Sequence, residues 1–147
     1  MNAEKLITPA KQEEIKAAIK KAEKVTSGEI RVVVEDICKA DVLDRAAHLF
    51  HKLKMHETKE RNGVLIYVSV DDRKLAIIGD AGIHKIVKDD FWNKIKEDMT
   101  NHFRQGHIAE GIVHAVHEAG KALSHHFPCQ KDDRDELSDE IFFGDGK

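Results

Sequence analysis

The chain has 147 residues, of which 35% are charged and 41% hydrophobic, and its formal net charge is −3. This length fits a single domain with a sizeable core, and the composition excludes membrane-spanning and collagen-like chains. No stretch approaches the roughly 20 apolar residues of a membrane span and no apolar run marks a signal peptide, so we expect a cytoplasmic protein.

The first third of the chain predicts a helix followed by a buried strand. Thr8 and Pro9 form an N-cap with proline at the first helical position, and apolar residues at helical spacing extend the helix to about Lys24. Residues 29–35 are β-branched and become continuously apolar. That composition is typical of a strand buried on both faces.

The middle of the chain predicts a second helix and two more strands. Asp41 caps a helix whose apolar stripe runs to Leu53. Residues 63–70 form the next apolar strand, and a strand, helix, strand order with this crossover length predicts a parallel pair. Asp71 and Asp72 then turn the chain into an antiparallel strand over residues 74–78.

The last part of the chain predicts helices and an acidic tail. A short helical piece over 83–87 precedes a helix capped by Asp89, and a final helix spans about 108–125. The tail from Pro128 to Lys147 holds three basic and seven acidic residues. We predict a domain over 1–127 and a tail over 128–147 that is disordered apart from the apolar segment Ile141-Phe-Phe143.

Helices alternating among strands predict an α/β fold. The sheet should be covered on both faces. The expected architecture is a three-layer α/β/α sandwich around a small mixed sheet, built from a parallel βαβ unit and a hairpin.

Several short motifs in order resemble the TPM domain family. They are Thr26-Ser-Gly-Glu-Ile30, Arg61-Asn-Gly-Val-Leu-Ile-Tyr67, Asp72-Arg73 with Gly82 nine residues later, Phe103-Arg-Gln-Gly-His107 and Glu110-Gly111. The resemblance covers roughly residues 8–127. Because some members of that family have been described as acid phosphatases, it implies a phosphatase-like protein. Where the family has Gly-aromatic-Gly-Leu-Glu, this chain has Asp80-Ala-Gly82-Ile-His84, so any site that uses that glutamate is altered.

The first hypothesis is a divalent-cation site, and the resemblance to the TPM domain family supports it. In the predicted topology Glu29, Asn62 and Asp80 share one edge of the sheet, and Asp89 stands where the family commonly has an aspartate. These oxygen donors suit Ca²⁺ or Mg²⁺, and Arg61 could bind an anion beside them. The alternative is structural: Asp89 caps a helix, Asn62 and Asp80 are turn residues, and Glu29 is a solvated strand end.

A rival acidic cluster is predicted at the opposite edge of the sheet. Glu35 and Asp36 leave the first strand there, Asp71 and Asp72 form the hairpin turn, and Arg73 could supply a cation for an anionic ligand. Ligands usually bind at the carboxyl ends of parallel strands, but paired aspartates are also ordinary turn residues. A phosphatase acting at either edge would need an activated water, because the chain has no aspartyl- or cysteinyl-phosphate motif.

Histidines and cysteines offer weaker candidates. His48 with His51, His114 with His117, and the pair His125 and His126 could place imidazoles together for zinc, but no third ligand is evident and solvated helix surface is the preferred interpretation. Cys38 and Cys129 have no CxxC spacing, so we expect reduced thiols.

Two functions of different classes follow. The first is a divalent-cation-binding domain with weak metal-dependent phosphomonoesterase activity. The second is a non-enzymatic interaction or assembly factor whose segment Ile141-Phe-Phe143 docks on a protein partner or folds back on its own domain. We expect a monomer that binds neither nucleic acid nor membrane.

Overall fold

A mixed four-stranded sheet forms the middle layer of the protein. The computed structural model describes residues 6–129 and 141–144. The strands lie in the order β3-β2-β1-β4, with the bounds β1 (Glu29–Glu35), β2 (Gly63–Ser69), β3 (Lys74–Gly79) and β4 (Phe142–Gly144).

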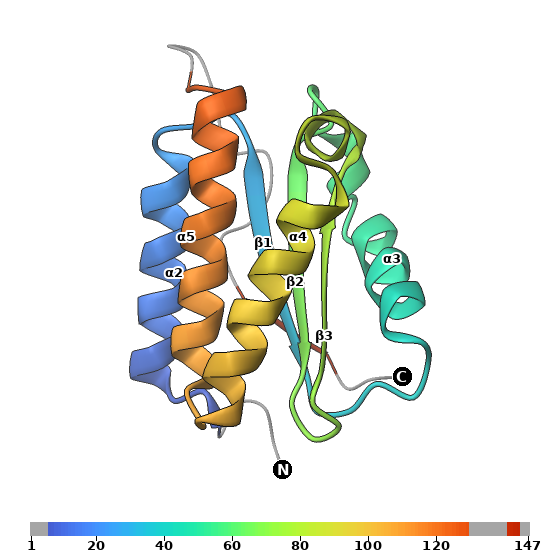
Figure 1. Ribbon diagram of the computed structural model, residues 1–147, viewed down its shortest axis with the longest axis vertical. Coiled ribbons are helices and arrows are strands. Elements are labelled where there is room, and N and C mark those ends of the chain that lie inside the picture. Colours follow the sequence, from blue (N-terminus) through green and yellow to red (C-terminus); the bar gives the residue numbers. More distant parts are fainter. Residues whose placement is uncertain (1–5, 130–140, 145–147) are drawn as a thin grey trace.

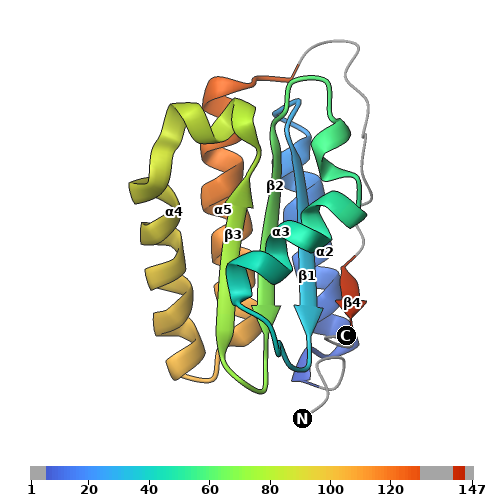
Figure 2. The same ribbon diagram turned by 90° about the vertical axis from the view of Figure 1, so that its right-hand side faces the viewer.

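Helices cover both faces of this sheet, as Figure 1 and Figure 2 show. One face carries α2 (Pro9–Glu23), α4 (Ala81–Arg104) and α5 (Ile108–His126), and the other carries α3 (Val42–Lys52), which is followed by the short 3-10 helix η1 (Met55–Glu57). The predicted three-layer α/β/α sandwich is therefore confirmed. None of the helices in the described part of the chain is long and apolar enough to cross a membrane.

The predicted N-caps explain where two helices begin. The Thr8 side chain accepts a hydrogen bond from the backbone N–H of Lys11 at the start of α2. The Asp41 carboxylate accepts hydrogen bonds from the backbone N–H groups of Leu43 and Asp44, at 3.0 and 3.1 Å, at the start of α3. Both caps satisfy backbone donors that have no partner inside the helix.

Two apolar cores lie on opposite faces of the sheet because side chains alternate along each strand. Val32 and Val34 of β1 belong to the core beneath α2, α4 and α5. Val33 of β1 and Tyr67 of β2 belong to the core beneath α3. Strand β1 is therefore buried on both faces, as its apolar sequence predicts.

The strand register brings the predicted cation ligands Glu29, Asn62 and Asp80 to one edge of the sheet. Strands β1 and β2 are parallel with Glu29 opposite Gly63, and β2 and β3 are antiparallel with Val64 opposite Gly79. Glu29 begins β1, Asn62 immediately precedes β2, and Asp80 immediately follows β3. We call this the amino-terminal edge.

Helix α4 begins earlier than the sequence predicts. Its N-cap is Asp80, whose carboxylate accepts a hydrogen bond from the backbone N–H of Ala81 at 2.8 Å. A kink at Lys88, with φ 62° and ψ −177°, divides it at the predicted junction between a short piece and a longer helix. Asp89 therefore lies within α4, directly after the kink.

The C-terminal segment adds a strand that the predicted sheet lacks. Phe142–Gly144 pairs in parallel with β1, so Val33, Val34 and Glu35 lie opposite Phe142, Phe143 and Gly144. Of the two outcomes predicted for the apolar tail segment, the structure shows the one in which it folds back on its own domain. The disorder predicted for the rest of the tail concerns mainly residues 130–140 and 145–147, which lie outside the described residues.

Candidate functional site

Three of the four predicted cation ligands are buried at the amino-terminal edge. Glu29 is 2% exposed, Asn62 1% and Asp80 6%. The structural alternative treats Glu29 as a solvated strand end, and its burial contradicts that part of the alternative. Burying polar groups is costly unless they find partners, so their partners decide what this edge can do.

Asn62 offers an oxygen that the fold leaves available. Its backbone N–H donates to the Thr58 hydroxyl at 3.2 Å, and its side-chain amide donates to the Ser27 hydroxyl at 3.2 Å. Its Oδ1 atom is buried and accepts no hydrogen bond from the described residues. Such an oxygen is a suitable ligand for a hard cation.

Asp80 is held by Arg61 in a two-pronged ion pair. Nε and Nη2 of Arg61 donate to the two carboxylate oxygens at 2.7 and 2.8 Å. The hydrogen bond to Asp80 raises the pKa of the Arg61 guanidinium. A cation bound to Asp80 would have to share this carboxylate with the guanidinium, and an anion at Arg61 would have to use its remaining donors.

Asp89, the fourth predicted ligand, is not buried with the other three. Its side chain is 84% exposed, and it lies 3.5 Å from Nε2 of His84. Over residues 6–129 and 141–144, no three His, Cys, Asp or Glu side chains gather closely enough to hold a metal ion. A cation at the amino-terminal edge would therefore depend on Asn62, backbone oxygens and water besides the carboxylates.

The rival acidic cluster at the opposite edge is built into a buried network around Glu35. This carboxylate is fully buried. It accepts hydrogen bonds from Arg45 Nε and Nη2 at 3.0 and 2.6 Å, and from the Tyr67 hydroxyl at 2.6 Å. The hydrogen bond to Glu35 raises the pKa of Arg45. Both oxygens of Glu35 thus already have strong donors.

Asp72, in the hairpin turn, is also engaged within the fold. It accepts hydrogen bonds from the backbone N–H of Cys38 at 3.0 Å and from the Ser69 hydroxyl, and Lys74 Nζ lies 3.7 Å away. Burial alone would raise the pKa of Asp72, but these hydrogen bonds lower it overall. The turn is thereby joined to the loop after β1.

Tyr67 supplies a direct pH test of this network. It is the single tyrosine of the chain, and burial, followed by hydrogen bonds to Glu35 and Cys38, raises the pKa of its hydroxyl. The raised pKa contributes stability that is present below about pH 10 and is lost as the pH rises further. We expect the phenolate absorbance of the folded protein to stay flat through about pH 10 and to rise only as the chain unfolds. An absorbance change centred near pH 10 in the folded protein, as in denaturant, would contradict this.

The predicted histidine pairs do not assemble a metal site among the described residues. His114 lies 3.2 Å from an Asp98 carboxylate oxygen and stacks on His102. His125 and His126 contact each other edge to face. Cys38 and Cys129 are both free thiols, as expected.

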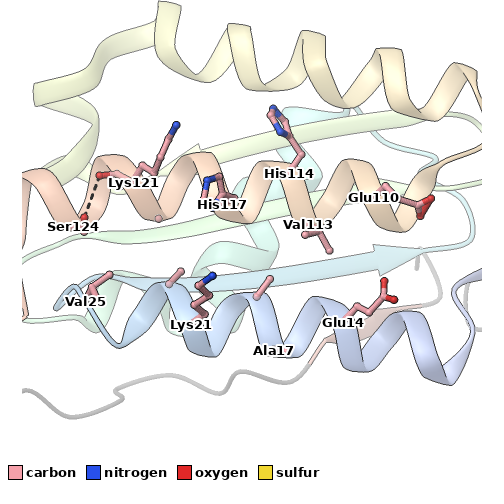
Figure 3. Close-up of a pocket in the computed structure, with 13 residues that line it drawn as sticks. Glu14, Ala17, Lys21, Val25, Glu110, Val113, His114, His117, Lys121 and Ser124 are labelled. Carbon is pink, nitrogen blue, oxygen red and sulfur yellow. Dashed lines mark hydrogen bonds between the residues drawn. The ribbon is translucent and has the colours of Figure 1, made fainter.

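A groove of about 610 Å³ between α2 and α5 is a feature that the sequence reasoning missed (Figure 3). Small residues such as Ala17 and Gly120 line it, together with the longer polar side chains of Lys21, His117 and Lys121. Small residues at helical spacing on both helices are the signal that could have predicted it. None of the predicted cation ligands lines this groove.

Comparison with known proteins identifies the domain. The model of the TPM domain family matches residues 1–122, which is most of the chain. The chain belongs to the TPM domain family. The match spans Glu29, Arg61, Asn62, Asp80 and Asp89 and ends before β4.

Solved structures share this TPM fold. The NMR structure of the BA42 protein from the psychrophilic bacterium Bizionia argentinensis is 47% identical, with a TM-score of 0.87, over 94% of this chain and 95% of that one. The N-terminal domain of a P. gingivalis protein is 24% identical, with a TM-score of 0.67, over 85% of this chain and 83% of that one. The N-terminal domain of a Corynebacterium glutamicum protein is 14% identical, with a TM-score of 0.64, over 80% and 74%. No curated protein matches the chain.

His84 occupies the position where the family pattern has glutamate. Its Nδ1 accepts a hydrogen bond from Trp92 Nε1 at 3.0 Å, and its Nε2 faces Asp89. The imidazole therefore links the two parts of α4 across the kink at Lys88. A cation ligand at this position would have to be an imidazole in place of a carboxylate.

Proposed function

We propose that this TPM domain binds a divalent cation, Ca²⁺ or Mg²⁺, at its amino-terminal edge through Glu29, Asn62 and Asp80. The observation that carries the proposal is the Asn62 Oδ1 atom, which is buried and accepts no hydrogen bond from the described residues. It shares its edge of the sheet with two buried carboxylates.

The chemistry of these donors favours a hard cation. Ca²⁺ takes six to eight oxygen ligands from carboxylates, amides, backbone carbonyls and water, and Mg²⁺ keeps several of its waters. Two carboxylates and one amide oxygen fit either ion as a partial shell that water completes. Arg61 forms an ion pair with Asp80, so the cation would share that carboxylate with the guanidinium.

Thermal melting with and without Ca²⁺ or Mg²⁺ tests the site. A ligand at 100 times its Kd stabilises a protein by about 2.7 kcal/mol, so we expect the wild-type Tm to rise by several degrees. Glu29→Gln and Asp80→Asn each remove one ligand charge and should abolish most of the rise. Glu13→Gln is the matched control, because its side chain is 73% exposed on α2, and it should keep the full rise. No rise in the wild type with either ion, or an equal rise in Glu29→Gln, would contradict the proposal.

Asp89 and Arg61 complete the predicted site and can be tested beside it. Because the Asp89 side chain is exposed at the kink, we expect Asp89→Asn to leave the cation affinity unchanged. A loss of affinity like that of Asp80→Asn would show that Asp89 is a ligand. If Arg61 orients an anion, inorganic phosphate should bind more tightly in the presence of the cation, and Arg61→Gln should remove that gain.

Weak phosphomonoesterase activity is the catalytic form of the proposal. The cation would activate a water and Arg61 would neutralise phosphoryl oxygens. Hydrolysis of a generic aryl phosphate should then require the divalent cation and disappear in Asp80→Asn. Phosphatase activity that persists in the presence of a chelator would show that the activity does not depend on this site.

A non-enzymatic interaction role is the second candidate. The observation that favours it is the segment Phe142–Gly144, which forms a strand at the outer side of β1. If this role is correct, the domain should bind its protein partner equally well with and without divalent cations.

A further inference from the structure

A second cavity lies at the end of the sheet opposite the amino-terminal edge. Its volume is about 530 Å³, within the range of roughly 300–1,000 Å³ that small-molecule sites occupy. The turn between β2 and β3 borders it on one side, and the end of α4 and the start of α5 border it on the other. These segments lie together at the lower end of the molecule in Figure 1. We call this space the hairpin cavity.

The lining of the hairpin cavity is mainly apolar. Its apolar residues come from several elements and are Leu6, Val68, Val70, Leu75, Phe103 and Ile108. Four of them, Val70, Leu75, Phe103 and Ile108, pack against the core beneath α2, α4 and α5 but are only partly buried. The fold therefore leaves apolar surface beside this core, and an apolar ligand would remove that surface from water.

Two positively charged residues, Arg73 and Arg104, also line the cavity. Both are exposed, and neither makes a hydrogen bond or an ion pair within the described part of the chain. Arg45 and Arg61, by contrast, each hold a carboxylate with two hydrogen bonds. Because an arginine guanidinium stays protonated, Arg73 and Arg104 keep their charge and their donors available for a ligand.

The charge of the lining is positive throughout. The described residues that line the cavity include no Asp or Glu. Asp72, next to Arg73 in the turn, is engaged with Cys38, Ser69 and Lys74. A bound anion would therefore meet two cations and no like charge from the described lining.

The backbone determines where both arginines lie. Arg73 has a φ of 54°, in the left-handed region that favours glycine, so the hairpin turn places a charged side chain at a position of backbone strain. Arg104 is the last residue of α4, and Gly106, with a φ of 80°, then turns the chain toward α5. A hydrogen bond from Gly106 N–H to Phe103 O at 3.0 Å closes this second turn. The two arginines thus stand at opposite borders of the cavity.

We propose that the hairpin cavity binds an amphiphilic anion, a molecule with an apolar chain and a carboxylate or phosphate group at its end. The chain lies on the apolar lining, and the anionic group accepts hydrogen bonds from Arg73 and Arg104, since the guanidinium fork matches both carboxylate and phosphate. This inference goes beyond the proposed cation site and uses none of its residues. The failure of either proposal therefore leaves the other in place.

Octanoate titrated into the full-length protein tests the cavity, with calorimetry to measure affinity and amide NMR shifts to locate the site. We expect saturable shifts at Val70, Leu75 and Ile108. Hexanoate should bind roughly tenfold or more weakly than octanoate, since each buried methylene contributes about fourfold in affinity. Octanol has the same chain without the charge and should also bind roughly tenfold more weakly. Tighter binding of octanoate than of octyl phosphate would identify a carboxylic acid as the ligand class, and the reverse order a phosphate monoester.

Three variants test the role of the arginines. Arg73→Gln and Arg104→Gln should each weaken octanoate binding roughly tenfold, because each removes a charge-assisted hydrogen bond. Both side chains are exposed, so we expect these variants to fold as the wild type does. Lys85→Gln is the matched control: it removes one positive charge from an exposed position on α4 outside the cavity and should keep the wild-type affinity.

Four results would overturn the proposal. The first is that the amide signals of Val70, Leu75 and Ile108 stay in place while octanoate reaches millimolar concentration. The second is that octanol binds as tightly as octanoate, and the third is that Lys85→Gln costs as much affinity as the two arginine variants. The fourth is that the same amide signals shift with protein concentration alone, which would assign the cavity to a second copy of this chain.

Discussion

Replacing Arg45 by Met should lower the free energy of unfolding of this protein by about 3–5 kcal/mol. Arg45 donates two hydrogen bonds to Glu35, whose side chain is fully buried, and is itself only 12% exposed. The substitution removes the guanidinium partner of a buried carboxylate that also accepts a hydrogen bond from the Tyr67 hydroxyl. Urea unfolding followed by circular dichroism measures the loss.

Two further variants separate charge burial from lost packing. Combining Arg45→Met with Glu35→Gln removes the uncompensated charge and should recover a large part of the lost stability. Lys11→Met breaks an exposed ion pair to Glu110 at 3.1 Å, and we expect it to cost less than about 1 kcal/mol. If Arg45→Met costs no more than Lys11→Met, the network is not a main support of the fold.

Gly82→Ala should destabilise the domain by about 1–3 kcal/mol and disturb the amino-terminal edge. A Cβ atom here would clash with the carbonyl oxygen of Glu60 and lie 2.6 Å from that of Arg61. Both obstacles are backbone, so the start of α4 and the loop before β2 must move apart. The hydrogen bond from Gly82 N–H to Arg61 O, at 2.7 Å, should weaken, and the Arg61–Asp80 pair should shift with it.

Gly106→Ala is the matched control for this steric effect. A Cβ atom on Gly106 meets nothing within 4 Å, and its φ of 80° confines the cost to backbone strain. Both variants should lose stability, but only Gly82→Ala should shift the amide NMR signals of Arg61, Asn62 and Asp80 and lower the cation affinity. Equal shifts in the two variants would mean that the close contact at Gly82 does not position the edge.

Most of the fold could be predicted because its signals are local. Thr8, Pro9 and Asp41 mark helix starts by hydrogen bonds to residues within one turn, and β-branched runs mark β1 and β2. Strand β4 could not be predicted as part of the sheet, since three residues carry no periodicity and their pairing with β1 spans more than 100 positions.

The candidate site could be predicted only in part, for a related physical reason. The shared edge of Glu29, Asn62 and Asp80 follows from strand order and register, which the sequence pattern predicts. Side-chain pairing does not follow from strand order. The ion pair from Arg61 to Asp80 and the kink that keeps Asp89 exposed both depend on how α4 packs over the edge.

The side-chain amide of Asn62 provides the most direct measurement of the proposed cation site. Its Nδ2 donates to Ser27, and its Oδ1 is buried and accepts no hydrogen bond from the described residues. Coordination through Oδ1 should therefore shift these amide NMR signals during a Ca²⁺ or Mg²⁺ titration. We predict a saturable shift at Asn62, with smaller shifts at Glu29 and Asp80, which Glu29→Gln weakens and Glu13→Gln preserves. If the Asn62 signals stay in place while either ion reaches millimolar concentration, or move equally in Glu29→Gln, this edge does not bind the cation.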